Sequence, residues 1–116
     1  MSSTELSAAL ERFAEARQWK RFHSPKNLSM ALAVEAAELL EIFQWLDEAE
    51  SRNPAPEILA QVREEIGDVQ IYLTRLASQL GIDPIQAAWR KLEKNEMKYP
   101  VEKARGNPKK YTEFES

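Results

Sequence analysis

Apolar residues recur at intervals of three and four along most of this chain, which is the spacing of one face of a helix. No stretch alternates apolar and polar residues as a half-buried strand does. The pattern predicts an all-α fold built from four helices, expected at about residues 2–19, 25–50, 56–80 and 84–98. Residues 1–100 are therefore expected to form one helical domain, and residues 101–116, which have no period, an extended or partly ordered tail.

Residue types that begin and end helices stand at the junctions of this pattern. At three predicted helix starts, the capping residue is followed directly by a proline, or by a glutamate or glutamine three positions later, or by both. Asn53-Pro54 repeats the pattern of a capping residue and a proline in the turn before the third helix. The other starting residues are Ser2 with Glu5, Ser24 with Pro25, and Asp83 with Pro84 and Gln86. Gly81 is typical of a helix end.

Two of the predicted helices carry acidic residues at positions where packing residues are expected. On a wheel of about 100° per residue, Glu35 lies inside the apolar sector of the second helix and Glu38 lies at its edge. Glu65 and Asp68 take the same places on the third helix, at an offset of 30 residues. A short proline-containing turn makes these helices antiparallel neighbours, so the two acidic pairs are expected to face each other.

Four carboxylates at one place repel one another, and burying even one unpaired ion costs several kcal/mol. Protonation of some acids or neutralisation by divalent cations would relieve that cost. All-oxygen ligands suit Mg²⁺, with Mn²⁺ as a substitute. A di-iron site is a poor alternative, because such bundles carry histidine in their ligand motifs and the single histidine, His23, lies in a connector.

Composition narrows the classes of function. A net charge of −3 argues against broad nucleic-acid binding, and the lack of cysteine excludes disulfides and thiolate metal sites. No stretch has the ~20 apolar residues of a membrane helix, and the N-terminus does not resemble a signal peptide. The cytoplasm is the expected location, with no nucleic-acid or membrane partner.

Three stretches of the sequence together resemble the MazG-like, all-α nucleoside triphosphate pyrophosphohydrolases, and more closely their dCTP pyrophosphatase branch. These are RQWKRFHSPKNLSMALAVEAAELLEIFQW, EEIGDVQIYLTRLA and KLEKNEMKYPVEKARGNPKKYT. The resemblance implies Mg²⁺-dependent cleavage of a (deoxy)nucleoside triphosphate, such as dCTP, between the α and β phosphates. It also implies a four-helix bundle that assembles as a homodimer or homotetramer, with sites built between subunits.

The resemblance also implies roles for individual residues. The metal ligands carry over to Glu35, Glu38, Glu65 and Asp68. Many members have a glutamate just before the first motif where this chain has Val34, so the base is left open; Glu38 is our candidate for orienting the attacking water, with Glu41 as the alternative. The substrate-binding residues expected are His23, Trp45, Tyr72, Lys91, Asn95 and Lys98.

Trp19 and Trp89 are interpreted as packing residues. Two further hypotheses stay open. One is a broader house-cleaning pyrophosphohydrolase, or one acting on phosphoribosyl-ATP. The other is a non-catalytic helical interaction module whose acids bind a structural cation.

Overall fold

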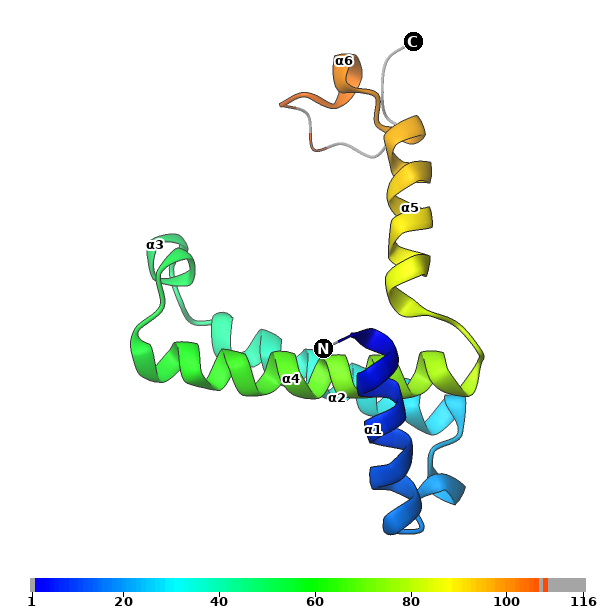
Figure 1. Cartoon of the computed structure of the whole chain (residues 1–116). Helices are drawn as coiled ribbons and strands as arrows, with labels where there is room; N and C mark the ends of the chain where they lie inside the picture. The colour runs from blue at the N-terminus through cyan, green and yellow to red at the C-terminus, as the bar shows by residue number, and fades with distance from the viewer. Residues whose placement is uncertain (1, 107, 109–116) are drawn as a thin grey trace. The chain divides into compact units, whose positions relative to one another are not determined.

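The computed structural model describes residues 2–106 and residue 108. Every regular element in that part of the chain is a helix, which confirms the predicted all-α class (Figure 1). In chain order these are α1 Ser3–Ala16, the short 3-10 helix η1 Lys20–Phe22, α2 Pro25–Phe43, α3 Glu48–Arg52, α4 Pro56–Gln79, α5 Pro84–Lys98 and α6 Val101–Ala104. Among these helices, none combines the length and the apolar character needed to cross a bilayer.

The starts of α1 and α2 follow the predicted signals. The Ser2 hydroxyl accepts a hydrogen bond from the Glu5 backbone N–H at 3.1 Å, and the Glu5 carboxylate accepts one from the Ser2 N–H at 3.3 Å. The Ser24 hydroxyl accepts a hydrogen bond from the Asn27 backbone N–H, and Pro25 is the first residue of α2. After α4, Gly81 takes a φ of 67°, the left-handed conformation expected at a helix end.

Two predicted boundaries were wrong. The first helix ends at Ala16 rather than near Trp19, because Gln18 turns the backbone into the left-handed region with a φ of 55°. The second ends at Phe43 rather than near residue 50, since Asp47 forms a capping box with Glu50 and starts α3 instead.

The predicted start of the third helix near Pro56 is confirmed, but the cap-plus-proline pair Asn53-Pro54 does not form it. Asn53 lies at the end of α3, and α4 begins two residues after Pro54, with Ala55 as its cap and Pro56 as its first residue.

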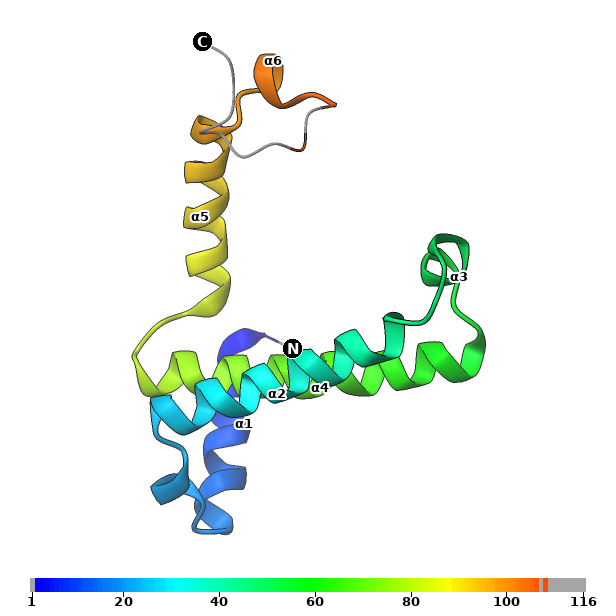
Figure 2. The same cartoon turned by 180° about the vertical axis from the view of Figure 1, so that it is seen from behind.

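Contacts within the chain divide it into two compact units, residues 1–83 and residues 84–116. The domain boundary expected at residue 100 stays a prediction. In the first unit α2 and α4 run side by side in opposite directions, and α1 packs against α4 (Figures 1 and 2). The buried apolar side chains of the described residues are few, namely Ala14, Leu28, Val62 and Ala77. Of the expected tail, α6 forms one short helix, and residues 107 and 109–116 lie outside the described part.

A buried ion pair joins α1 to α4. Arg75 is 2% exposed, and its Nη1 donates to Glu11 Oε2 at 2.5 Å. Glu11 also pairs with Lys20 of η1 at 2.7 Å. The hydrogen bonds from Lys20 and then from Arg75 lower the pKa of Glu11, so this contribution to stability is present above the ordinary glutamate value of 4.5 and is lost as the pH falls below it.

Replacing Glu11 by alanine is expected to lower the free energy of unfolding by about 2 kcal/mol, because Arg75 would keep a buried charge without its carboxylate. We expect less than for a fully buried pair, since the Glu11 side chain is 33% exposed. Glu48→Ala is the matched control: its pair with Arg52 is solvent-exposed and should contribute about 0.5 kcal/mol or less. Urea unfolding at pH 7 measures both variants, and equal losses would contradict this role of Glu11.

Candidate active site

Three carboxylates from α2 and α4 converge between the two helices. One oxygen each from Glu35, Glu38 and Glu65 lies within 4.8 Å of the others. Glu35 and Glu65 come from equivalent places in the two apolar stripes, and antiparallel packing of the stripes brings them opposite each other. The cluster therefore follows from the position of each acid on its own helix.

The cluster has the properties of a cation site. Glu35 Oε2 and Glu65 Oε2 are both buried, and neither has a hydrogen-bond partner in the described part of the chain. Buried oxygens normally have such partners, so these two have capacity for a ligand. The donors are all carboxylate oxygens, which fit a hard divalent ion such as Mg²⁺ or Mn²⁺.

Mutual repulsion in the cluster affects its titration. Hydrogen bonding with Glu38 lowers the pKa of Glu35, but burial, Glu65 and the charge of Asp68 together outweigh it, and the pKa of Glu35 is raised. The pKa of Glu38 is also raised, chiefly by its hydrogen bond with Glu35 and by the charge of that residue. The folded chain thus holds these two acids at a cost when they are ionised.

Asp68 lies beside this cluster and does not belong to the group of three. It follows Glu65 by one helical turn on α4, and its charge contributes to the raised pKa of Glu35. It also lines a cavity of about 240 Å³. Asp68 is therefore the residue that connects the acidic cluster to the cavity.

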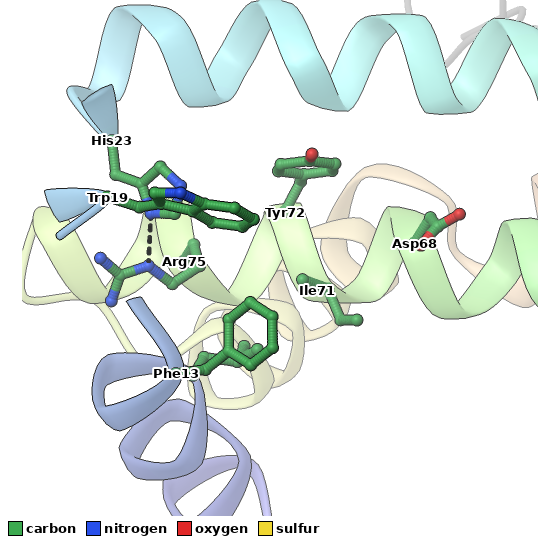
Figure 3. Close-up of a pocket in the computed structure, with 8 residues that line it drawn as sticks. Phe13, Trp19, His23, Asp68, Ile71, Tyr72 and Arg75 are labelled. Atoms are coloured by element: carbon green, nitrogen blue, oxygen red, sulfur yellow. Dashed lines mark hydrogen bonds between the residues drawn. The ribbon is translucent and has the colours of Figure 1, made fainter. Parts of the chain in front are cut away.

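Aromatic rings form much of the wall of that cavity. Its lining residues come from α1 and the connections before and after η1 on one side and from α4 on the other: Leu10, Phe13, Trp19, His23, Asp68, Ile71, Tyr72 and Arg75. The ring centroids of Phe13 and Trp19 are 5.7 Å apart, and those of Trp19 and His23 are 6.3 Å apart, both in edge-to-face arrangements. Figure 3 shows His23 near one end of this group and Asp68 near the other, with Tyr72 between them.

This arrangement adds residues that the sequence analysis missed. Trp19, interpreted there as a packing residue, lines the cavity and is 44% exposed. Its position in the chain offered no signal for this role, because the first helix was expected to reach Trp19. Arg75 was not singled out at all, and it also lines the cavity.

A second, more open hollow of about 500 Å³ adjoins the acidic cluster. Glu38, Glu41, Gln61, Glu64 and Glu65 line it, together with Ile42. Both candidates for orienting water, Glu38 and Glu41, therefore face the same space.

The remaining predicted site residues come from the segment after α2 and from α5. Trp45 follows the end of α2, is 86% exposed, and does not line the aromatic cavity. Lys91, Asn95 and Lys98 lie on α5, in the second compact unit, at a spacing that places them on one face of that helix. Their part in the site stays a prediction.

We expect Glu35→Gln to raise the melting temperature of the metal-free protein by a few degrees at pH 7, because the amide carries no charge against its neighbours. A carboxyl whose pKa is raised on folding reduces stability as the pH rises above its ordinary value of 4.5, so the gain should vanish as the pH falls to that value. Mg²⁺ should then stabilise the unaltered protein more than the variant. Thermal unfolding with and without EDTA tests this, with Glu48→Gln as control; a variant less stable than the control at pH 7 would contradict it.

Known proteins resemble this chain over most of its length. The dCTP pyrophosphatase 1 of Rattus norvegicus is 43% identical over 104 residues, and the protein of the same name from Homo sapiens is 41% identical over the same length. Each alignment covers 88% of this chain but only 61% of the relative, so the chain spans less than two thirds of those proteins.

A solved structure agrees with this result. The crystal structure of a pyrophosphatase from Archaeoglobus fulgidus is 46% identical in sequence and superposes with a TM-score of 0.75, covering 84% of this chain and 91% of that one. Residues 30–114 match the MazG-like family, and this range includes most of α2, all of α4 and every member of the acidic cluster. The resemblance seen in the sequence is confirmed: this chain belongs to the MazG-like family.

Proposed function

We propose that this protein is a Mg²⁺-dependent nucleoside triphosphate pyrophosphohydrolase that acts on dCTP or a modified dCTP and releases the monophosphate and pyrophosphate. The observation that carries the proposal is the position of Asp68, which lies beside the carboxylate cluster and also lines the aromatic cavity. A single nucleotide needs both environments next to each other, one for its phosphates and one for its base. The names of the rat and human relatives favour dCTP as the substrate.

Glu35, Glu38, Glu65 and Asp68 would hold the metal. When bound, Mg²⁺ would neutralise phosphate oxygens, lower the pKa of a coordinated water and offset the charge that develops on pyrophosphate. The acids are anchored on two long helices that pack along each other, so their separation is fixed by the fold and not by a loop.

The protein's own groups supply position and proton transfer. Glu38 and Glu41 face the open hollow beside the cluster, where one of them would orient a water and take its proton. The water oxygen forms a bond to the α-phosphorus, the bond from that phosphorus to the bridging oxygen breaks, and pyrophosphate leaves with the bonding electrons. Lys91 and Lys98 of α5 would offset the charge of the leaving group, with Asn95 as a polar contact.

The aromatic cavity would hold the base. Trp19, Phe13 and Tyr72 present flat apolar surfaces, which suit a planar ring, and few polar groups are available to fix its orientation. Three residues of the lining carry polar nitrogen atoms: His23, Arg75 and, through its indole N–H, Trp19. Trp45 would contact the nucleotide only from outside this cavity.

We also propose that the chain functions as a homodimer or homotetramer. Leu59, Ile66, Leu73 and Leu80 repeat every seven residues along and just after α4, and each is between 38% and 54% exposed. A seven-residue apolar repeat keeps to one side of a helix and is typical of a seam that packs on another helix. Together with the small buried core, this favours burial of the stripe against a second copy, which would complete the expected bundle.

The reaction is tested by incubating the protein with Mg²⁺ and a panel of common and 5-modified nucleoside triphosphates. Monophosphate with pyrophosphate is expected, and dCTP or a modified dCTP should react fastest. Diphosphate with orthophosphate would exclude the proposed bond. Equal rates on all bases would favour a broad house-cleaning enzyme, and stabilisation by Mg²⁺ without turnover would favour a non-catalytic module.

Glu35→Gln and Asp68→Asn should each lower kcat at least about 100-fold, because each removes a charged ligand that stabilises the transition state. Circular dichroism should show unchanged helix content, and Glu48→Gln on α3 should keep full activity. Near-normal turnover in both site variants would contradict the assignment.

Leu73→Lys should shift the protein towards the monomer, since a charge would be buried in the seam. Gln79→Lys adds the same charge at an exposed position near the end of α4 and should leave the assembly unchanged. Light scattering after size-exclusion chromatography gives the mass of each. A monomeric unaltered protein, or no change in Leu73→Lys, would contradict the use of this face.

A further inference from the structure

The hydrogen bond between Arg75 and His23 fixes where the proton of the histidine lies. Arg75 Nε donates to His23 Nδ1 across 3.3 Å (Figure 3). A guanidinium nitrogen can only donate, so Nδ1 has to be the unprotonated, accepting nitrogen of the ring. A neutral imidazole with a bare Nδ1 carries its proton on Nε2. His23, which lines the cavity, therefore carries an N–H donor at Nε2, and no hydrogen bond joins this group to the described part of the chain.

Arg75 is held firmly enough to impose this state. Its side chain is 2% exposed, and Nη1 is bound to Glu11, which in turn is held by Lys20. Arg75 comes from α4, Glu11 from α1 and His23 from the connector after η1, so three separate segments meet here. A buried guanidinium between two partners has little freedom to leave either of them.

The charges around His23 keep the ring neutral. Burial, and then the positive charge of Arg75, lower the pKa of His23 below its ordinary value of 6.5, while the negative charge of Glu11 raises it by less. Lys20 pairs with Glu11, and Asp68 lines the same cavity as His23. His23 is thus a neutral donor above pH 6.5, and the hydrogen-bond geometry and the charges agree on this.

We propose that Arg75 is a positioning residue that fixes His23 as an Nε2–H donor, and that His23 thereby selects a planar ring presenting a hydrogen-bond acceptor. The aromatic walls hold the ring, and the acceptor is a carbonyl oxygen or a bare ring nitrogen, both of which cytosine carries. A ring that turned an amino group towards Nε2–H would leave two donors facing each other without partners, which weakens binding. The selection of a base by His23 rests on the proposed function, whereas the position of the proton on His23 does not.

The first test reads the proton directly. Because the chain has a single histidine, two-bond ¹H–¹⁵N spectra of the imidazole have one source. The unaltered protein should show a bare Nδ1 and a protonated Nε2 from pH 7 to pH 8. Arg75→Met, which removes the donor at similar volume, should populate both tautomers and return the pKa towards 6.5, whereas Arg75→Gln, which keeps an N–H donor, should restore the Nε2–H form. A proton on Nδ1 in the unaltered protein, or an unchanged spectrum in Arg75→Met, overturns the proposal.

The second test measures the selective role through binding of dCMP without metal, by calorimetry. His23→Phe and Arg75→Met should each weaken binding about ten-fold, which corresponds to 1.4 kcal/mol and to the loss of one hydrogen bond. Arg75→Gln should bind within about three-fold of the unaltered protein. Arg63→Met, at an exposed site on the same helix, is the matched control and should have no effect. Equal dCMP affinity in all variants, or no binding by the unaltered protein, overturns the selective role.

These outcomes separate the inference from the proposed function. A protein that shows the expected tautomer and dCMP pattern but hydrolyses no triphosphate retains the inference and loses the proposed activity. A protein that hydrolyses the triphosphate efficiently but carries the proton on Nδ1 retains the proposed activity and loses the inference.

Discussion

Repulsion among carboxylates between α2 and α4 is the constraint on which the proposed site depends. Glu35 and Glu65 occupy packing positions, and one oxygen of each is buried without a hydrogen-bond partner in the described part of the chain. Apolar residues there would make a more stable pair of helices, so the acids are a cost to folding. Binding of a hard divalent cation would relieve this repulsion, and the relief would add to the affinity for the ion because the helices already hold the ligands together. Glu35 therefore lowers the stability of the metal-free fold while serving the proposed activity.

A second electrostatic arrangement organises the other end of the cavity. Arg75 is buried against Glu11 and His23, which ties α1 and the connector after η1 to α4. The same contacts that hold these segments together determine which nitrogen of His23 carries a proton. Trp19, which belongs to the aromatic wall of the cavity, comes from this part of the chain. The same cavity is lined by Arg75 and His23 and by Asp68. The fold and the chemistry of the cavity thus depend on the same few bonds.

Helical period was enough to predict the all-α class and the convergence of Glu35, Glu38 and Glu65, because both follow from positions on single helices. Contacts between distant parts of the chain could not be predicted this way. Arg75 and Glu11 lie 64 residues apart, and only packing shows that they meet. Local signals were also overlooked: Asp47 and Glu50 form a capping box that ends the apparent continuity of the second helix. Trp45 shares the apolar stripe of α2 by extrapolation, but the helix stops before it and leaves the ring exposed.

The most direct test of the account is a crystal structure of the unaltered protein grown with Mn²⁺, with anomalous scattering recorded near the manganese edge. Mn²⁺ takes the same oxygen ligands as Mg²⁺ and can be identified by its signal. The account predicts an anomalous peak at about 2.1–2.2 Å from oxygens of Glu35, Glu38 and Glu65, close to the distances that Mg²⁺ adopts. A map with no peak at this cluster, and with these carboxylates turned into solvent, would contradict it.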